Sequence, residues 1–406
     1  MTLKVLLLTQ WFDPEPTFKG LAFAKELKRQ GIDVDVITGF PNYPGGKVYD
    51  GYAIKAYQKE IIDNVDINRV PIYPDHGKSA IKRIFNYLSF FFSSSLYGIF
   101  RRKKVDVIYA YHPPLTTALS ASLISLIRRT PFVIDVQDLW PDTLAATGML
   151  NNTKILKVVD IVCHFIYKRA SKIIVLSPGF KKTLIERGVP DDKIEIIYNW
   201  CDEEKIRNFE KSEHLLPNNG FNVVFAGNLG LAQGLPAIVD TAKLLIERKI
   251  KANIVIIGSG IAKIEAEQKA EDLELDNIYF IPRVPVSQVG DLLNQADALL
   301  VHLIDDELFK ITIPSRTQAY MACGKPIVMA VGGDATDLIK QAEAGIICFS
   351  NDPVSMADGI EHLCQLTSIE LERLGNNGKN FYESKLSLNE GVRRFITIFN
   401  EVTGSK

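Results

Sequence analysis

Short apolar runs typical of buried strands alternate with longer helix-like segments along the whole chain. Strands that are apolar at nearly every position are buried on both faces, so the alternation predicts parallel sheets covered by helices. We expect a first series of strands at residues 4–9, 34–38, 105–111, 132–136, 172–176 and 194–198. We expect a second series at residues 222–226, 252–257, 277–281, 298–303, 326–330 and 345–349.

A polar stretch divides the two series. Residues 201–220 end in Pro-Asn-Asn-Gly, a composition typical of a connection between domains. A single barrel would need no such break, and 406 residues exceed the usual size of one core. The sequence therefore predicts an α/β protein with two doubly wound, Rossmann-like domains, residues 1–203 and 204–385, facing across a ligand-binding cleft. The helical segment 386–406 is expected to cross back to the first domain.

Composition excludes several function classes. The chain has 47 basic and 48 acidic residues, so no overall positive field favours nucleic acid. Five cysteines occur without a CxxC pair, and we therefore expect neither a zinc site nor a disulfide framework, but a reducing cytosol. The apolar run at the start is short, which favours a strand over a signal peptide.

Several glycines follow the second-series strands and are candidates for phosphate binding. A strand, a glycine turn and a helix N-terminus together present free backbone N–H groups to an anion. The turn after the expected strand at residues 222–226 lacks the GxGxxG spacing of dinucleotide enzymes. The alternative explanation for its glycines is close packing of the chain alone. These candidates, with one arginine just beyond a strand, are Gly227, Gly230, Gly258, Gly260 and Arg283.

The strongest local signal is the segment ITIPSRTQAYMACGKPIV. Ser315 is expected as the N-cap of a short helix that ends at Gly324, with Arg316 and Thr317 in its first turn. A cation is unfavourable at the positive end of a helix unless an anion neutralises it. Arg316 therefore indicates a bound phosphate.

In the first domain, polar side chains follow two expected strands. Asp138 and Trp140 come after residues 132–136, and His112 comes after residues 105–111. A carboxylate beside an indole suits the hydroxyls and the apolar face of a sugar, so Asp138 and His112 are the candidate catalytic residues. Capping of the next helix is the alternative role of Asp138.

Residues 84–100 are mostly apolar and aromatic, with Lys82 and Arg83 before them and four cations, residues 101–104, after them. The segment is short for a membrane span and contains several serines. We expect it to dock the first domain onto an anionic membrane surface; a helix buried against the sheet is the alternative.

Taken together, these segments resemble family 4 of the retaining glycosyltransferases with the GT-B fold. The matching segments include GNLGLAQGL, IIGSG, FIPRVPVSQVGDLLNQADALLVHL and AYMACGKPIV, in the order of that family. The forms FPNYPGGKVYDGY, DLWPD and IPSRTQAYMACGKP are similar to bacterial O-antigen and capsule enzymes, particularly N-acetyl-L-fucosamine transferases. The resemblance implies a UDP-sugar donor, no metal or other cofactor, an undecaprenyl-diphosphate-linked saccharide acceptor, and a peripheral position on the cytoplasmic face of the bacterial plasma membrane.

The sequence departs from this family at two places. The arginine and lysine of the family's glycine turn correspond to Asn228 and Gln233, so Arg283, Lys310 and Arg316 are expected to hold the diphosphate instead. The family's paired glutamates fall near Ile311 and Ala319. The ribose and donor sugar must then be bound by other groups, with Glu307 and Gln318 as candidates.

Two other functions are compatible with these residues. A sugar-nucleotide epimerase uses the same architecture without an acceptor. A catalytically silent binding subunit of a polysaccharide assembly complex is the second alternative, because the usual glutamates are missing.

Overall fold

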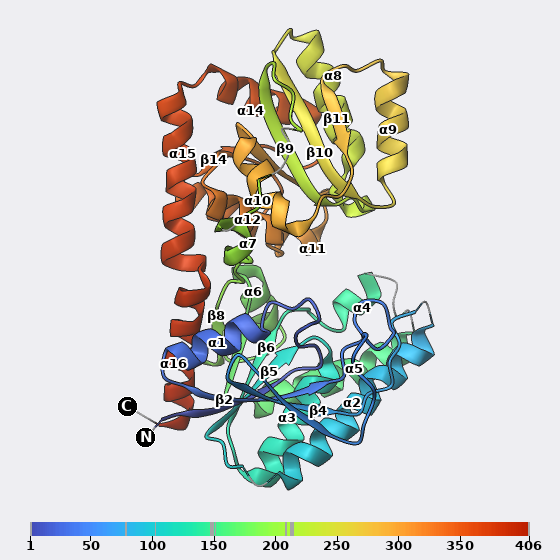
Figure 1. Cartoon of the computed structure of the whole chain (residues 1–406), viewed down its shortest axis with the longest axis vertical. Helices are drawn as coiled ribbons and strands as arrows, with labels where there is room; N and C mark the ends of the chain where they lie inside the picture. Colours follow the sequence, from blue (N-terminus) through green and yellow to red (C-terminus); the bar gives the residue numbers. More distant parts are fainter. Residues whose placement is uncertain are drawn as a thin grey trace. The chain divides into compact units, whose positions relative to one another are not determined.

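The computed structural model describes residues 2–77, 79–101, 103–146, 150, 152–207, 209–211 and 215–404. The chain divides into two compact units. The N-terminal unit comprises Met1–Leu176, Phe180–Ile197 and Gly391–Lys406, and the C-terminal unit comprises Ser177–Gly179 and Tyr198–Glu390. The divisions thus fall after residues 197 and 390, whereas the sequence pattern placed them after residues 203 and 385. Each unit is an α/β domain built on a mainly parallel sheet (Figure 1), which confirms the predicted fold class.

The N-terminal unit holds an eight-stranded sheet in the order β3-β4-β2-β1-β5-β6-β7-β8. Its strands are β1 (Lys4–Leu8), β2 (Asp33–Gly39), β3 (Gln58–Ile62), β4 (Val65–Val70), β5 (Val107–His112), β6 (Phe132–Val136), β7 (Lys172–Val175) and β8 (Ile194–Ile196). Its helical segments are α1 (Leu21–Arg29), α2 (Ala80–Phe100), α3 (Leu115–Arg128), α4 (Asp142–Ala146), α5 (Thr153–Arg169), α6 (Pro178–Glu186, which begins in the C-terminal unit) and the 3₁₀ turn η1 (Asp191–Lys193). All neighbouring strands are parallel except β3 and β4.

The C-terminal unit holds a six-stranded, fully parallel sheet in the order β11-β10-β9-β12-β13-β14. Its strands are β9 (Phe221–Asn228), β10 (Ala252–Ser259), β11 (Ile278–Ile281), β12 (Ala298–His302), β13 (Ile327–Ala330) and β14 (Gly345–Ile347). Its helical segments are α7 (Glu203–Arg207), η2 (Leu231–Gln233), α8 (Leu235–Glu247), α9 (Lys263–Asp272), α10 (Val286–Gln295), α11 (Glu307–Lys310), α12 (Ser315–Cys323), α13 (Asp334–Ala342), α14 (Pro353–Gln365), α15 (Ser368–Phe381) and the π-helical turn η3 (Tyr382–Leu386).

All twelve expected strands are present, with ends within two residues of those predicted. The hairpin of β3 and β4 was missed, because its sequences QKEII and VDINRV contain no apolar run. The stretch 201–220 is not simply a connection, since it contains α7, which packs on α10 and α12 of the C-terminal unit.

The last helix, α16 (Leu388–Thr403), supplies core to the N-terminal unit from residue 391 onward. The ring of Phe395 is fully buried and lies 5.1 Å from that of Phe23 and 5.2 Å from that of Tyr109, measured between centroids. Edge-to-face packing of this kind stabilises aromatic pairs beyond their buried area.

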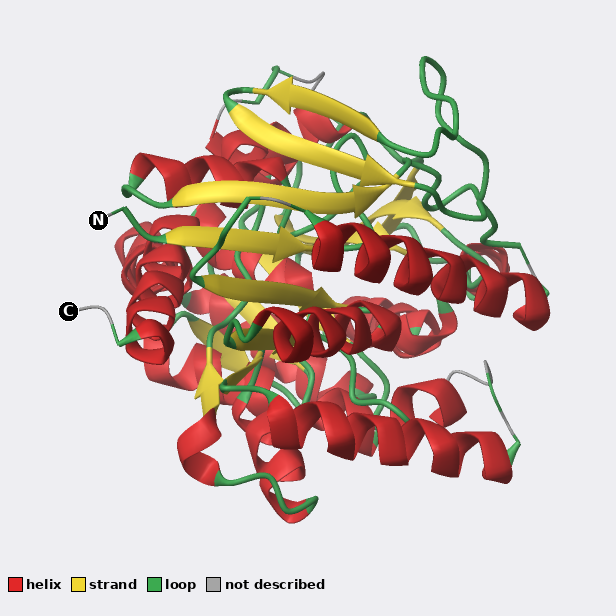
Figure 2. Ribbon diagram, turned by 90° about the horizontal axis from the view of Figure 1, so that it is seen from below, coloured by secondary structure: helices red, strands yellow, loops and turns green. Residues whose placement is uncertain are grey.

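Helix α2 has one buried and one exposed face. Its buried face carries Asn86, Phe90 and Ser94, and the Ser94 hydroxyl lies 2.9 Å from that of Ser120 on α3. Helix α3 packs between α2 and α5. Figure 2 draws the helices in red. The exposed face of α2 is an almost continuous apolar stripe, formed by Ile81, Ile84, Phe85, Leu88, Phe92, Leu96 and Phe100. Helix α5 exposes a second stripe, formed by Ile155, Val158, Ile161 and Phe165.

None of the helices in the described part of the chain is long and apolar enough to cross a membrane. The alternative of a buried helix holds for one face of α2 only, since its other face is exposed, and membrane docking of residues 84–100 stays a prediction.

Candidate functional site

Ligands of open parallel sheets bind at the carboxyl ends of strands where the strand order reverses. In the C-terminal unit the order reverses between β9 and β12, since β10 and β11 lie to one side and β13 and β14 to the other. In the N-terminal unit it reverses between β1 and β5. Most of the candidate residues lie at these two places.

Glycine is required at the ends of β9 and β10 for backbone packing. Gly227 and Gly258 are paired across the two strands, with φ of 142° and 150°. A Cβ on Gly258 would overlap the Gly227 carbonyl oxygen, and a Cβ on Gly260 would overlap the Leu229 backbone. Close backbone packing therefore requires glycine at Gly258 and Gly260. At Gly227 the nearest neighbour of a Cβ would instead be Arg316 Nη2, at 3.2 Å.

Arg316 lies in the first turn of α12, and its guanidinium sits over the ring of Phe225 on β9, 4.2 Å from the centroid. Its Nη1 is buried and has no hydrogen-bond partner among the described residues. Burial lowers the pKa of Arg316, with Tyr320 opposing the shift. A desolvated guanidinium with an unpaired N–H, held beside the bare backbone of Gly227, is a ready site for an oxyanion.

The glycine turn is held by side chains within it and by a histidine that the sequence analysis missed. Gln233 Oε1 accepts the Gly230 N–H at 2.9 Å, so part of its amide is occupied in closing the turn. His302, at the end of β12, donates from Nδ1 to the Gln233 carbonyl at 2.7 Å and accepts the Asn351 N–H at Nε2. The only sequence signal for His302 is a polar residue that ends the buried run ALLVH.

The remaining residues at the start of α12 have different roles. Pro314, rather than Ser315, occupies the N-cap position, and Ser315 is exposed without a capping hydrogen bond, so the predicted cap is wrong. Gly324 ends the helix with φ of 70°, as predicted. The Thr317 hydroxyl is buried and has no hydrogen-bond partner among the described residues. The Gln318 side-chain amide donates to the backbone carbonyls of Pro314 at 2.9 Å and Ser315 at 3.2 Å.

Of three other candidates, Lys310 and Arg283 lie beyond other strands, whereas Asn228 ends β9 itself. Lys310 is paired with Glu307 at 2.6 Å and with Asp305 at 3.4 Å, and its backbone packs against Gly333 beyond β13. Arg283 is exposed beyond β11, the edge strand, two positions from β9 in the sheet. Asn228 ends β9, with its side-chain amide beside Gly230. The structure thus gathers Gly227, Asn228, Gly230, Gln233 and Arg316 around one turn, but not Lys310, Glu307 or Arg283.

In the N-terminal unit, His112 ends β5 at the reversal of strand order. Its side chain is fully buried, both ring nitrogens lack hydrogen-bond partners among the described residues, and its ring meets that of Trp140 edge-on at 5.7 Å. Burial lowers the pKa of His112 to about 3. The imidazole is therefore neutral at physiological pH, with one donor and one acceptor free for a ligand.

Asp138 follows β6 and is half-buried. Burial raises the pKa of its carboxyl, and its charge in turn contributes to the raised pKa of Tyr87, so the two side chains lie near each other. Helix α4 begins only at Asp142, four residues later, so Asp138 is not the N-cap of that helix.

An aromatic cluster at the same sheet edge was not predicted. Trp11 stacks on Tyr43 at 4.6 Å, and the His76 ring lies 5.0 Å from Tyr43 and 5.8 Å from Trp11. Trp11 Nε1 and His76 Nε2 are buried without partners among the described residues. Apolar ring faces edged by free N–H groups are typical of saccharide sites.

Two buried charges in the N-terminal unit have structural roles. Glu15 accepts the backbone N–H groups of Asn42 at 2.7 Å, Tyr43 at 2.8 Å and Phe12 at 3.1 Å, which joins the loops after β1 and β2. Burial raises the pKa of Glu15 to about 7, although these N–H groups oppose the shift. Burial likewise lowers the pKa of Lys19 to about 8, with the charge of Asp135 opposing it.

No group of three or more His, Cys, Asp or Glu side chains in the described ranges could hold a metal ion. The five cysteines are free thiols.

Comparison with known families identifies the chain. Residues 21–200 match the glycosyl transferase 4-like domain, and residues 206–381 match glycosyl transferases group 1. The chain belongs to the group 1 glycosyltransferases. The predicted enzyme class is therefore confirmed.

The relatives of this glycosyltransferase include two bacterial proteins. The putative colanic acid biosynthesis glycosyl transferase WcaI of Escherichia coli K12 is 25% identical, over 99% of this chain and 100% of its own. The probable glycosyltransferase WbjE of Pseudomonas aeruginosa is 25% identical, over 76% of this chain and 77% of its own. Among solved structures, Anabaena Alr3699/HepE in complex with UDP and glucose has a TM-score of 0.67 at 16% identity, covering 98% and 100% of the two chains. The last comparison supports the GT-B fold.

We predict that His112 makes the stability of the enzyme depend on pH. On acidification this residue takes up a proton near pH 6.5 in the unfolded chain, but only near pH 3 in the folded chain. Because the unfolded state binds the proton first, the free energy of unfolding falls as the pH is lowered. Between pH 6.5 and 5 the loss is about 2 kcal/mol. His112→Gln should remove this contribution to the pH dependence of the free energy of unfolding, as measured by urea unfolding between pH 6.5 and 5. If the free energy of unfolding falls equally with pH in both proteins, the assignment is contradicted.

Proposed function

We propose that this glycosyltransferase moves a sugar from a UDP-sugar to a lipid-diphosphate-linked saccharide, with retention of anomeric configuration, during bacterial surface polysaccharide synthesis. The observation that carries the donor half of the proposal is the Arg316 guanidinium beside Gly227, whose Nη1 is buried and has no hydrogen-bond partner among the described residues. The UDP and UDP-glucose in the crystal structures of HepE, and the naming of WcaI for colanic acid biosynthesis, support the class of donor and the kind of pathway.

The donor diphosphate would bind at the carboxyl ends of β9 and β12. Its negative oxygens would pair with Arg316 and lie against the backbone of the turn that His302 and Gln233 hold in place. In this proposal Arg316 takes the role that a metal ion has in other transferases, since charge-assisted hydrogen bonds stabilise the leaving diphosphate.

The acceptor would bind at the carboxyl ends of β1, β5 and β6. The rings of Trp11 and Tyr43 offer apolar faces for a sugar, and the neutral His112 offers a donor and an acceptor for its hydroxyls. Asp138, whose pKa is raised by burial, would orient or deprotonate the attacking hydroxyl. We propose that the transferred sugar is an N-acetylated hexosamine or deoxyhexosamine, such as N-acetyl-L-fucosamine.

The exposed stripe of α2 would dock the N-terminal unit on the cytoplasmic membrane surface, where a lipid-linked acceptor resides. The basic residues that would serve this docking include only part of the set that the sequence indicated. Arg101 is buried against Asp35, Lys103 is paired with carboxylates, and Arg102 lies outside the described residues. The exposed cations that remain are Lys82 and Lys104 near the ends of α2, and Lys154 and Lys157 beside the stripe of α5. Each would contribute about 1 kcal/mol near anionic lipid.

The donor site is tested by Arg316→Ala. A lost charge-assisted hydrogen bond costs about 1.5 to 3 kcal/mol, so UDP affinity should fall about tenfold or more while the fold is retained. Isothermal titration calorimetry with UDP measures the change. Arg373→Ala, at an exposed position on α15, is the matched control and should bind as the wild type does. Equal affinity of all three proteins would rule out Arg316.

The acceptor site is tested by Asp138→Asn, which keeps size and removes charge. Loss of a positioned acid or base lowers turnover about a hundredfold or more, so acceptor-dependent UDP release should collapse while UDP affinity is unchanged. Undiminished turnover would show that the carboxylate takes no part in the reaction.

Membrane docking is tested by sedimentation with vesicles. Wild type should bind phosphatidylglycerol vesicles, bind less in high salt, and not bind phosphatidylcholine vesicles, because the attraction is partly electrostatic. The double variant Phe85→Ser, Phe92→Ser should bind several-fold more weakly. Phe349→Ser removes an equally exposed aromatic from the C-terminal unit and is the control. If the double variant still sediments with the vesicles as the wild type does, α2 is not the docking surface.

A further inference from the structure

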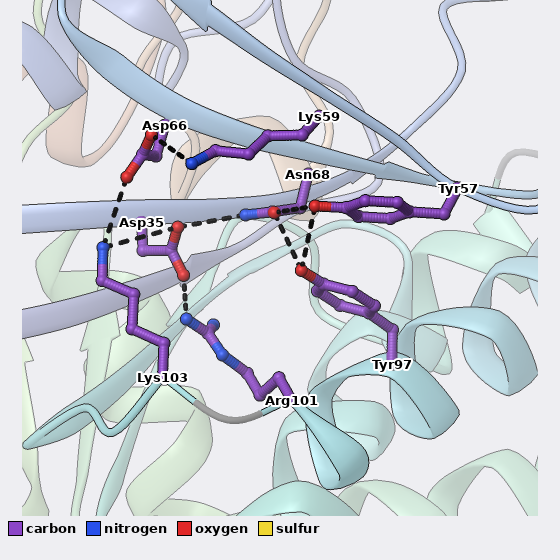
Figure 3. A pocket seen from close by; sticks show the side chains of 8 residues that line it. All are labelled: Asp35, Tyr57, Lys59, Asp66, Asn68, Tyr97, Arg101 and Lys103. Carbon is purple, nitrogen blue, oxygen red and sulfur yellow. Dashed lines mark hydrogen bonds and ion pairs between the residues drawn. The ribbon is translucent and has the colours of Figure 1, made fainter.

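The N-terminal unit contains a polar pocket of about 370 Å³ that takes no part in the proposed reaction. It lies on the amino half of β2 and β4, beside β3 and the C-terminal end of α2 (Figure 3). His112 and Asp138 lie at or beyond the carboxyl ends of their strands, so the pocket belongs to the other end of the sheet. It is lined by Asp35, Tyr57, Lys59, Asp66, Asn68, Tyr97, Arg101 and Lys103.

The acceptor atoms of this pocket are already occupied. Asp35 Oδ1 accepts from Asn68 Nδ2 at 3.0 Å, and Asp35 Oδ2 is paired with Arg101. The two oxygens of Asp66 are paired with Lys59 at 3.1 Å and with Lys103 at 3.5 Å. Asn68 Oδ1 accepts from the hydroxyls of Tyr97 at 2.8 Å and Tyr57 at 2.9 Å, as the dashed lines of Figure 3 show.

The donors, by contrast, are in excess. The Arg101 side chain is only 3% exposed, and its Nε and Nη1 have no hydrogen-bond partner among the described residues. Lys103 Nζ lies 3.5 to 3.9 Å from three carboxylates and closer to none of them. Three cations line the pocket against two carboxylates, and a third carboxylate, that of Asp33, lies 3.9 Å from Lys103 Nζ. Burying unpaired N–H groups of a guanidinium is costly, so the missing component is an acceptor with negative charge.

We propose that this pocket binds a small oxyanion of the phosphate class, held by Arg101 and Lys103, with Lys59 at its side. The oxyanion is either free phosphate or the phosphate of a lipid headgroup. The second source is suggested by Leu96 and Phe100, which precede Arg101 on α2 and are 62% and 75% exposed on the apolar stripe. This inference does not depend on the donor or acceptor sites of the proposed function.

The experiment titrates the full-length protein with inorganic phosphate at constant ionic strength and follows the midpoint of thermal unfolding. A ligand that binds only the folded state raises this midpoint saturably. Lys103→Gln should weaken phosphate binding about tenfold, the effect of one charge-assisted hydrogen bond. Lys251→Gln changes an exposed lysine of the C-terminal unit and is the matched control. If Lys103→Gln does not fold, Lys59→Gln, at a half-exposed side chain, takes its place.

A second arm repeats the titration with dihexanoyl phosphatidylglycerol below its micelle concentration. Tighter binding of this lipid than of phosphate identifies the headgroup as the ligand, and equal or weaker binding identifies free phosphate. Both results support the proposal provided that Lys103→Gln, or Lys59→Gln in its place, loses affinity and Lys251→Gln does not. The absence of a saturable rise with either probe, or equal losses in the pocket and control variants, overturns it. UDP affinity, measured in parallel, shows whether the donor site is intact whatever the outcome.

Discussion

Burial of the strands on both faces is the constraint on which the rest of this structure depends. A strand such as β5 or β9 has apolar groups on both sides, so polar side chains find room mainly where the strand ends. Parallel connections bring the carboxyl ends to one edge, and a reversal of strand order separates the loops there. His112 lies at one reversal, and Arg316 is packed on Phe225 near the other.

The groups at these edges are held by neighbours but are not satisfied by them. The Arg316 guanidinium stacks on the ring of Phe225, and its Nη1 has no hydrogen-bond partner among the described residues. The His112 ring packs on Trp140, and neither of its nitrogens has a hydrogen-bond partner among the described residues. Such unpaired groups cost folding stability, which the large apolar cores offset. Their supports, in contrast, are fully engaged: Glu15 accepts three backbone N–H groups, and His302 uses both ring nitrogens. A ligand site requires polar groups without protein partners that are held in place by rigid, fully hydrogen-bonded neighbours.

Helix α2 shows how one element combines several tasks. Its buried face approaches α3 closely because Gly98 leaves room for Ile124. Its other face exposes apolar side chains along its length, and the residue after its C-terminal end, Arg101, enters a pocket with unpaired donors. Substitutions on this helix therefore have to be chosen by face, since Phe90 is core whereas Phe92 is 65% exposed.

The sequence alone determined the two-part α/β fold, because twelve apolar runs and their spacing are local properties of the chain. It also indicated the glycine turn and Arg316, since helix ends and strand ends can be recognised from neighbouring residues. It could not find the β3–β4 hairpin, because β4 joins the sheet by pairing with β2, and β3 joins it only by pairing with β4. Nor could it assign His302 or the cluster of Trp11, Tyr43 and His76, which come together from loops distant in sequence. Only the tertiary structure decided the surroundings of each cation: packing pairs Arg101 with Asp35 and places Arg316 beside Gly227, because long-range contacts and not local pattern set burial and charge pairing.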